Sequence, residues 1–241
     1  MLENPRSSRV KELAALQQKS ARSETGRFLV EGPAAVSEAL RYAPELVEEI
    51  FFTPEAGIKH EQLLSAAQDA GLTPEWVNEE VAKRLSDTVT PQGVIAVAKQ
   101  APVRFRDILS EVVKTVAILH NVRDPGNLGT IIRVADAAGV DAVLLTGRTV
   151  DAYSPKVVRS STGSIFHIPV AVNLDLYEVT SELKTAGVRI IAADISGEDL
   201  LEWQGQNSLA EPTAWLFGNE AAGLTDDELE QADLALRVPI Y

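Results

Sequence analysis

The stretch HNVRDPGNLGTIIRVADAAG, residues 120–139, decides how the second half of the chain is built. It joins a polar loop to an amphipathic helix that we predict over residues 128–138, closed by Gly139. Pro125 and Gly126 favour a tight turn in the loop, and Gly129 lets another backbone or a ligand approach closely. The apolar run TVAIL at residues 115–119 predicts a buried strand directly before the loop. A strand, a glycine-bearing loop and a helix in this order indicate an α/β sheet.

The same alternation continues beyond this stretch. Further strands are predicted at residues 142–145, 168–172, 189–194, 213–217 and 236–239, and further helices at 155–160, 176–186 and 225–232. Helices between consecutive strands predict a parallel sheet covered on both faces, with ligand-binding loops at the carboxyl ends of the strands. The glycine-bearing loops at 121–129 and 218–223 both fall at such ends.

The first 100 residues show a separate alternation of strands and helices. The predicted strands lie at 28–30, 47–52, 75–77 and 93–98, and the predicted helices at 7–20, 34–42, 59–70 and 79–85. This pattern indicates a small α/β domain over residues 1–100. The charged, proline-containing segment 101–112 predicts a linker, and residues 113–241 then form the second domain.

Composition excludes several kinds of chemistry. The 241 residues include no cysteine, which excludes disulfides, thiolate chemistry and cysteine-ligated zinc. No apolar run approaches the roughly 20 residues that span a bilayer, and the first residues lack the apolar core of a secretory signal. His60, His120 and His167 show no metal-ligand spacing, so we expect no metal site. These features predict a cytoplasmic protein without a membrane partner.

The distribution of charge bears on whether the partner is a nucleic acid. A net charge of −13 argues against one, because phosphate binding normally leaves a basic footprint. Residues 1–30, however, carry six basic against three acidic side chains, a local charge of +3 that leaves −16 for the rest. A basic amino-terminal segment on an acidic body is compatible with RNA binding through one face. Such a run is equally typical of a solvated surface.

Two segments carry residues suited to chemistry. In the first, Arg133 follows the polar loop that begins at Asn121, and an arginine there presents a rigid, permanently charged fork to a phosphate or carboxylate. The alternative is a solvated arginine on an exposed helix face. In the second, WLFGNEAAGLTDDEL at residues 215–229, two glycines flank Glu220. The alternative for this carboxylate is a bond to the amides of its own loop.

The loop at 218–223 is not a phosphate-binding fingerprint. Its glycine spacing approximates a P-loop, but Leu224 stands where a lysine is required, which excludes triphosphate binding of that kind. No G-x-G-x-x-G follows any predicted strand, so the classical dinucleotide fingerprint is also missing. A Rossmann-type nucleotide enzyme is therefore disfavoured.

Taken together, the motifs resemble the SpoU, or TrmH-type, branch of the SPOUT RNA methyltransferases. The pattern N-x-x-D-P-x-N-x-G-x-x-x-R-x-A-x-A-x-G at residues 121–139 is similar to motif 1 of that family. The G-x-E-x-x-G at 218–223 is similar to motif 2, and V-P-I at 238–240 to the opening of motif 3. KVVRSSTG at 156–163 and an amino-terminal stretch similar to the family's substrate-binding domain extend the resemblance over nearly the whole chain.

The resemblance implies an activity, a cofactor and a fold. The activity is transfer of a methyl group from S-adenosylmethionine to a ribose 2′-hydroxyl in structured RNA, with ribosomal RNA favoured over transfer RNA. The fold is an α/β parallel-sheet SPOUT domain with a carboxyl-terminal trefoil knot, preceded by a small ribosomal-protein-like RNA-binding domain. The resemblance also implies a homodimer.

The resemblance further implies roles for individual residues. Catalysis maps to Arg133, Asn121 and Glu220, with Arg133 either activating the hydroxyl or binding the neighbouring phosphate. The other two orient Arg133 or the ribose. Cofactor contacts map to Gly218, Asn219, Gly223, Val238 and Ile240. The candidate RNA-binding residues are Arg9, Lys11, Lys19, Arg22, Arg27, Lys156 and Arg159.

Family members normally continue past V-P-I with the rest of motif 3 and an apolar helix, whereas this sequence ends at Tyr241. We therefore expect the carboxyl-terminal end of the domain to be missing, and a crystal of this chain to hold no S-adenosylmethionine. One alternative function is a protein of the same fold that binds RNA or a ribosomal particle without catalysis. Another is a transfer RNA ribose methyltransferase.

Overall fold

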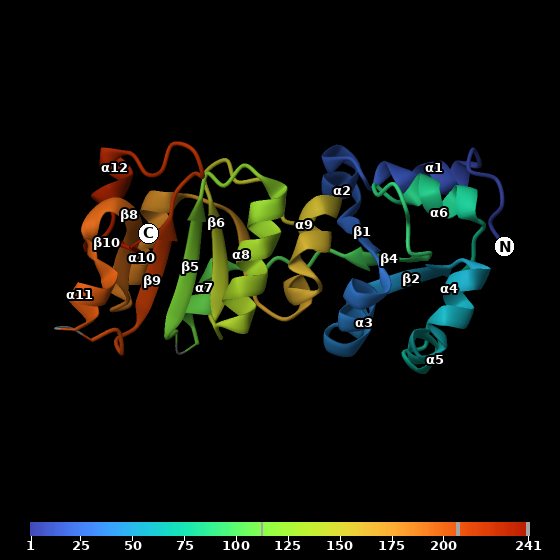
Figure 1. Cartoon of the computed structure of the whole chain (residues 1–241), viewed down its shortest axis with the longest axis horizontal. Coiled ribbons are helices and arrows are strands. Elements are labelled where there is room, and N and C mark those ends of the chain that lie inside the picture. The colour runs from blue at the N-terminus through green and yellow to red at the C-terminus, as the bar shows by residue number, and fades with distance from the viewer. Residues whose placement is uncertain (112, 206–207, 240–241) are drawn as a thin grey trace. The chain divides into compact units, whose positions relative to one another are not determined.

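The computed structural model describes residues 1–111, 113–205 and 208–239, and the chain folds into two compact units (Figure 1). Unit 1 comprises Met1–Ala101 with Asp151–His167, and unit 2 comprises Pro102–Val150 with Ile168–Tyr241. The chain therefore leaves unit 2 once, contributes one segment to unit 1, and returns. The division predicted from the sequence gives residues 151–167 to the second domain, because they lie between two of its strands.

Unit 1 is built on a four-stranded sheet with the order β1-β4-β2-β3. The strands are β1 (Arg27–Glu31), β2 (Val47–Phe52), β3 (Glu75–Trp76) and β4 (Val94–Lys99). β4 runs antiparallel to β1 and β2, and β3 runs parallel to β2. The helical elements are α1 (Ser8–Ala15), α2 (Lys19–Thr25), α3 (Pro33–Tyr42), η1 (Pro44–Leu46), α4 (Pro54–Lys59), α5 (Glu61–Asp69), α6 (Glu79–Leu85), α9 (Pro155–Ser161) and η2 (Ser164–Phe166).

Two helices of unit 1 differ from the prediction. The helix predicted at 59–70 is divided, because His60 takes a non-helical backbone conformation (φ −120°, ψ 45°) between α4 and α5. The helix predicted at 7–20 ends at Ala15, and a second helix, α2, begins at Lys19. Gly26, in the left-handed conformation at φ 66°, ends α2 just before β1.

The core of unit 1 lies between its sheet and the helices α1 and α6. Apolar side chains at helical spacing in these helices meet apolar side chains from three strands and from Val77, which follows β3. The cluster includes Val10, Leu13, Leu29, Phe51, Val77, Val81, Leu85, Ile95 and Val97. Burying each such side chain fully contributes about 1.5–3 kcal/mol, so this cluster contributes substantially to the stability of the unit.

Unit 2 is a six-stranded sheet with the order β10-β8-β9-β5-β6-β7, in which every neighbouring pair is parallel. The strands are β5 (Thr115–His120), β6 (Ala142–Thr146), β7 (Val170–Leu174), β8 (Arg189–Asp199), β9 (Thr213–Phe217) and β10 (Leu234–Arg237). The helices are α7 (Phe105–Leu109), α8 (Pro125–Ala137), α10 (Leu176–Thr185), α11 (Leu200–Gln204) and α12 (Asp226–Leu229). The predicted α/β fold with a parallel sheet is confirmed.

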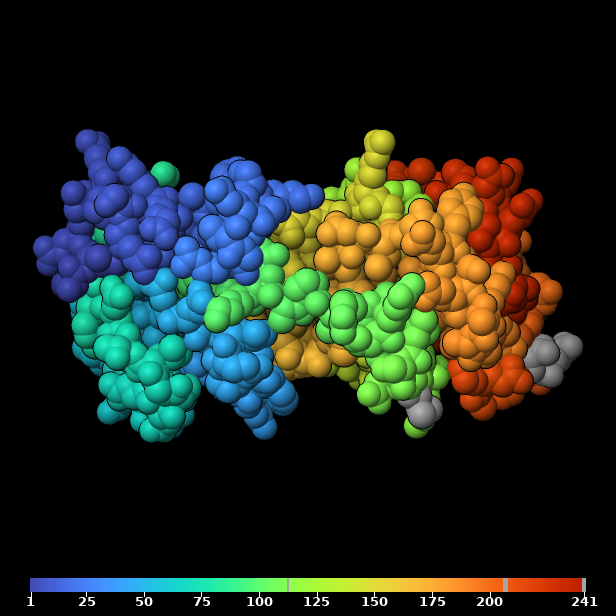
Figure 2. Space-filling model, turned by 180° about the vertical axis from the view of Figure 1, so that it is seen from behind, coloured from blue at the N-terminus to red at the C-terminus, as the bar shows by residue number. Residues whose placement is uncertain are grey.

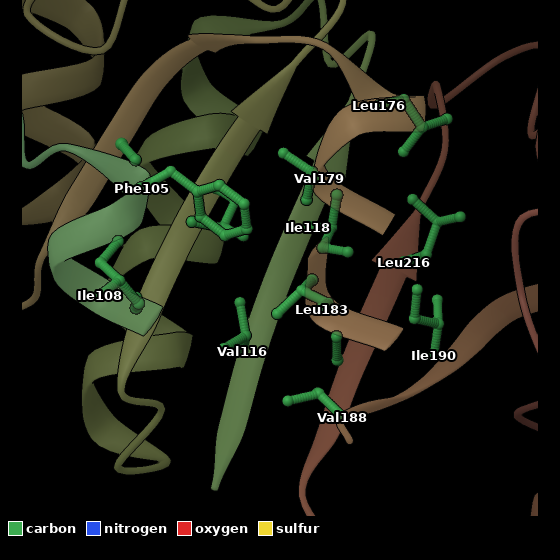
Figure 3. Close-up of a cluster of buried hydrophobic side chains, with 14 of the residues drawn as sticks. Phe105, Ile108, Val116, Ile118, Leu176, Val179, Leu183, Val188, Ile190 and Leu216 are labelled. Atoms are coloured by element: carbon green, nitrogen blue, oxygen red, sulfur yellow. The ribbon is translucent and has the colours of Figure 1, made fainter. Parts of the chain in front are cut away.

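Helices cover both faces of this sheet. On one face, α7 and α10 pack against side chains from β5, β8 and β9, as Figure 3 shows for Phe105, Ile108, Val116, Ile118, Val179, Leu183, Ile190 and Leu216. The same two helices, green and orange, form much of the visible surface of unit 2 in Figure 2. The alternate residues Ala117 and Leu119 of β5 are also buried, so the opposite face is covered too, and α8 packs there against β6. Burial on both faces accounts for the continuous apolar runs of these strands.

Within the described residues, no helix combines the length and apolarity needed to cross a bilayer. The trefoil knot that the resemblance implies stays a prediction. The fold places the two glycine-bearing loops at the carboxyl ends of parallel strands.

Candidate active site

The two glycine-bearing loops meet at one edge of the sheet in unit 2. β5 lies between β9 and β6, and all three run in the same direction. Leu119 pairs with Phe217, and His120 pairs with Thr146, so the three strands end side by side. The segments that follow them, residues 121–125, 147–150 and 218–223, therefore form one rim. The prediction that the loops fall at carboxyl strand ends is confirmed.

Glu220 joins the loop after β9 to the loop after β5. Its carboxylate accepts hydrogen bonds from the backbone N–H groups of Arg123 (3.2 Å) and Asp124 (3.1 Å) and from the side-chain amides of Asn127 (3.4 Å) and Asn219 (3.1 Å). Burial acts to raise the pKa of this carboxyl, but the hydrogen bonds from its own loop and from the facing loop outweigh burial and lower the pKa. Glu220 is thus a carboxylate that holds two loops in register.

The loop at 218–223 is held in shape by its own hydrogen bonds. Asn219 and Gly223 exchange backbone hydrogen bonds of 3.1 and 2.9 Å. The Asn219 side chain accepts the backbone N–H groups of Ala221 and Ala222 at 3.0 Å each and donates to the carbonyl of Asn121 at 2.9 Å, so its polar atoms are engaged within the protein. Gly218 has no room for a side chain, because an added Cβ would lie 2.5 Å from the carbonyl oxygen of Gly223.

Asn121 fixes the segment 147–150, which follows β6, to the loop after β5. It adopts a left-handed backbone conformation (φ 57°), which asparagine tolerates better than most residues. Its Oδ1 accepts the backbone N–H of Arg148 at 2.9 Å. Gly147 makes this approach possible, since it has φ +65° and an added Cβ would lie 2.6 Å from Asn121 Oδ1.

A buried histidine lies under Asn121. His120 Nε2 is 2.8 Å from Glu228 Oε1 and 2.7 Å from Asn121 Nδ2, and His120 Nδ1 is 2.9 Å from Thr146 Oγ1. With a proton on Nε2 the ring donates to Glu228; without it, Nε2 accepts from the Asn121 amide, so the two contacts exclude each other.

Burial acts to raise the pKa of the Glu228 carboxyl, but hydrogen bonds from the backbone N–H of Thr225 and from His120 outweigh it, and the pKa is lowered.

Arg133 stands apart from this network. It lies on α8, more than two turns after the N-cap residue Asp124, between the buried Ile132 and the exposed Val134. Its side chain is exposed and, among the residues that the structure describes, has neither an ion-pair nor a hydrogen-bond partner. Within the described residues, no hydrogen bond of Asn121 or Glu220 reaches Arg133. The expected orienting contacts therefore stay a prediction for the substrate-bound state.

The remaining candidate cofactor residues follow the last strand. Val238 is 59% exposed just after β10, where it offers apolar surface to a ligand. Ile240 lies outside the described residues. Across the residues the structure covers, no group of three or more His, Asp or Glu side chains is arranged to hold a metal ion.

The candidate RNA-binding residues lie in unit 1, and most are engaged there. Arg9 and Arg27 form ion pairs with the same two glutamates, Glu12 and Glu49. Arg22 is only 3% exposed, which takes it out of reach of a phosphate and gives it a structural role. Lys11 and Lys19 are exposed, with no ion-pair partner in the described chain.

The two candidates on α9 are also in unit 1. Arg159 forms ion pairs with Asp87 and with Glu31, the latter at 3.7 Å. Lys156 is exposed in the first turn of the helix. Because Arg159 is already neutralised by two carboxylates, it is a weaker candidate for RNA contact than its sequence position indicates.

Sequence reasoning missed three residues of the network around Asn121 and His120. Arg148 and Gly147 follow β6, and Glu228 lies in α12 at the capping-box position of Thr225. A Thr-Gly turn after a buried strand is a signal for Gly147, and the T-x-x-E pattern explains Glu228 as a helix cap. Neither pattern indicates a contact with Asn121 or His120, because those contacts depend on which strands are neighbours.

Comparisons with known proteins agree with this geometry. Residues 114–241 match the SpoU rRNA methylase family, and residues 7–96 match the MRM3-like substrate binding domain. The 23S rRNA (guanosine(2553)-2′-O)-methyltransferase RlmP of Bacillus subtilis is 35% identical over 240 residues, covering 100% of this chain and 90% of that protein. Mitochondrial rRNA methyltransferase 3 of the mouse is 36% identical over 180 residues, covering 73% of this chain and 42% of that protein.

A solved structure supports the same assignment. The AdoMet-bound rRNA methyltransferase from Sinorhizobium meliloti superposes with a TM-score of 0.84 at 32% identity, covering 100% of this chain and 88% of that one. The match therefore includes both units and the loops of the rim. The chain accordingly belongs to the SpoU rRNA methylase family, whose relatives matched above include an RNA 2′-O-methyltransferase.

Proposed function

We propose that this protein transfers a methyl group from S-adenosylmethionine to a ribose 2′-hydroxyl in ribosomal RNA, with large-subunit RNA as the substrate. One observation carries the proposal: the motif 1 and motif 2 loops are joined through Glu220 at adjacent strand ends, with the unpaired Arg133 on the helix that motif 1 begins. The names of the bacterial and mitochondrial relatives support ribosomal RNA over transfer RNA.

The residues of the rim fit S-adenosylmethionine. That molecule carries a positive sulfonium and no phosphate, and the loop at 218–223 has no lysine or arginine but includes Glu220. Gly218 and Gly223 set the shape of this loop, because a Cβ on Gly218 would lie 2.5 Å from the Gly223 carbonyl oxygen and a Cβ on Gly223 would lie 3.7 Å from Asp194 Oδ2. Gly218, Gly223 and the backbone of Asn219 would hold the cofactor, with apolar contact from Val238. When bound, the cofactor supplies an electrophilic methyl group.

The chain's own task is to place and activate the ribose hydroxyl. Alignment of the hydroxyl oxygen with the methyl carbon replaces a bimolecular encounter by a fixed geometry. Arg133 is a poor base, since a guanidinium is effectively never deprotonated in proteins. We assign it instead to the phosphate next to the reacting ribose and to the negative charge that develops on the 2′-oxygen. Asn121 and Glu220 hold the loops of the rim in place.

The other parts of the chain have supporting roles in this proposal. Unit 1, which joins residues 1–101 to residues 151–167, would select the RNA, with Lys11 and Lys19 among its cations that have no ion-pair partner in the described chain. Unit 2, whose core includes α7, would form the catalytic domain. The kinship with enzymes that modify bacterial ribosomal RNA supports a cytoplasmic location. A homodimer is the assembly we propose, with each active site near the interface.

The test is methyl transfer by the purified full-length protein. The protein is incubated with isotopically labelled S-adenosylmethionine and unmodified ribosomal RNA, and the RNA is digested to nucleosides and analysed by mass spectrometry. The proposal expects label in a 2′-O-methylnucleoside and none in base-methylated nucleosides. Label on a base, or transfer to transfer RNA but not to ribosomal RNA, would contradict it. Binding of ribosomal RNA without any transfer would favour the non-catalytic alternative.

A further inference from the structure

Two of the unpaired cations of unit 2 lie in the rim. Among the described residues of this unit, four basic side chains are in ion pairs: Arg104, Lys184, Arg189 and Arg237. Within the described residues, the side chains without an ion-pair partner are Arg106, Lys114, Arg123, Arg133 and Arg148, all of them exposed. Arg123 lies two residues after Asn121 in the segment 121–125, and Arg148 lies in the segment 147–150, which is bonded to Asn121.

The backbones of these two arginines are fixed next to the site. The backbone N–H of Arg148 donates to Asn121 Oδ1 at 2.9 Å, and that of Arg123 donates to Glu220 Oε2 at 3.2 Å. Two more hydrogen bonds join the segments: Val150 N–H to the Val122 carbonyl at 2.9 Å, and Val122 N–H to Thr149 Oγ1 at 3.2 Å. The main chain at both positions is therefore already ordered, and the side chains are free to contact a ligand. Less ordering of the backbone is then needed when a ligand binds.

Nearby carboxylates are already occupied. Glu220 accepts four hydrogen bonds, none of them from a guanidinium, and Asp124 Oδ1 accepts the Asn127 N–H at the start of α8. Glu228 is bonded to His120 and to the Thr225 N–H. The positive charge of Arg123 and Arg148 is therefore not taken up by the acidic groups of the rim, although the chain as a whole carries −13.

We propose that Arg123 and Arg148 bind the RNA sugar–phosphate backbone on either side of the target ribose. The inference rests on the proposed function, because every ribose inside an RNA strand is flanked by two phosphodiesters. A guanidinium presents a planar fork that matches phosphate oxygens and stays charged at every physiological pH. The acidic remainder of the chain repels RNA, so two arginines at the rim bias the strand toward the site that holds Asn121.

The experiment compares charge-removing variants at the rim with variants elsewhere in the same unit. Arg123→Gln, Arg148→Gln and the double variant are tested against Arg106→Gln and Lys114→Gln. These controls remove an equally exposed, unpaired charge, and Lys114 lies before β5, at the opposite end of that strand. RNA affinity is measured by filter binding at several salt concentrations, S-adenosylmethionine affinity by calorimetry, and folding by thermal melting.

Each rim variant is expected to weaken RNA binding about 10-fold and to reduce the salt slope of log K by about one. The methylation defect should appear in KM for RNA rather than in kcat, with cofactor affinity and melting temperature as in the unaltered chain. Arg→Lys variants at the same positions should keep most of the salt slope, because they keep the charge. The controls should change RNA affinity by less than twofold.

The inference is overturned if the rim variants bind RNA within twofold of the unaltered chain with the same salt slope. It is also overturned if Arg106→Gln or Lys114→Gln weakens binding as much as they do. Failure of the proposed function is distinguished by a different measurement. The unaltered chain would then transfer no methyl group to a ribose, while the RNA affinities of the rim variants could still be compared with those of the controls. An unaltered chain that binds no RNA contradicts both.

Discussion

At the scale of single residues, the site divides into groups that are bound within the protein and groups that are free. Glu220, Asn219 and Asn121 use their polar atoms to fix the loops. Arg133 is exposed and makes no ion pair with any residue in the described part of the chain. The bound groups are therefore suited to positioning, and the free guanidinium is suited to contacting substrate.

Replacing Arg133 by alanine should nearly abolish methyl transfer, by a factor of roughly 100 or more, because the developing charge on the ribose oxygen loses its cation. Cofactor affinity should stay within about twofold, since Arg133 is not among the residues proposed to hold the cofactor. Single-turnover transfer and calorimetric binding check the two halves of this prediction. Transfer at a near-normal rate would remove Arg133 from the mechanism.

The pKa of Glu228 gives a prediction about pH. Because the pKa is lowered in the folded protein, the carboxylate stabilises the fold above its unfolded pKa, and this contribution is lost as pH falls through the folded pKa. Glu228→Gln should therefore be less stable than the unaltered chain at pH 7, and the difference should shrink in acid. Thermal melting from pH 7 to pH 3 checks it, with the exposed Glu230→Gln as the matched control. A difference that stays constant over this range would contradict the assignment.

At the scale of elements, the site depends on which strands are neighbours. The sequence pattern predicts the strands, the helices and the placement of both glycine-bearing loops at carboxyl ends, because each of these follows from local periodicity. It does not predict that Glu220 bonds to the amides of the loop after β5, because that contact requires β9 to lie beside β5. The same limit hides Arg148, whose contact with Asn121 depends on the pairing of β5 with β6.

Gly218→Ala tests the loop as an element. Its Cβ would meet the Gly223 carbonyl at 2.5 Å, so the loop must shift, and cofactor affinity should fall about 10-fold or more with little loss of helical content. Gly139→Ala is the control, since it adds a Cβ at φ +68° with nothing within 4 Å. That change should cost roughly 1 kcal/mol of stability and leave cofactor affinity unchanged. Equal effects of both variants on cofactor binding would contradict the proposed pocket.

At the scale of the whole molecule, the compact units do not follow the order of the chain. Residues 151–167 lie between strands of unit 2 in sequence but pack in unit 1, where Arg22 binds Asp151 at 2.6 Å and the ring of Phe28 contacts that of Tyr153 at 4.9 Å between centroids. Local patterns predict the helix at 155–160 correctly as an element. They carry no information about a partner 129 residues away, so the unit to which the helix belongs could not be predicted.

The buried ion pair makes this packing testable. Arg22 is 3% exposed, and its guanidinium also donates to the carbonyls of residues 16 and 17 at 2.9 and 2.8 Å. Arg22→Ala should cost about 3–5 kcal/mol, because it leaves Asp151 without its cation. Combined with Asp151→Ala in a double-mutant cycle, it should show a coupling of at least about 1 kcal/mol. Arg104→Ala, which breaks an exposed pair with Asp107, is the control and should melt like the unaltered chain. Additive effects of the two unit 1 changes would contradict this account.

The most direct measurement of the central claim is a map of ribose 2′-O-methylation in ribosomal RNA from cells that lack this protein. Cells with the unaltered gene, and cells complemented with the Arg133→Ala variant, complete the comparison. The account predicts one position in large-subunit RNA that loses its 2′-O-methyl group in the deletion strain, regains it with the unaltered gene and stays unmethylated with the variant. An unchanged methylation map in the deletion strain, or full restoration by Arg133→Ala, would contradict it.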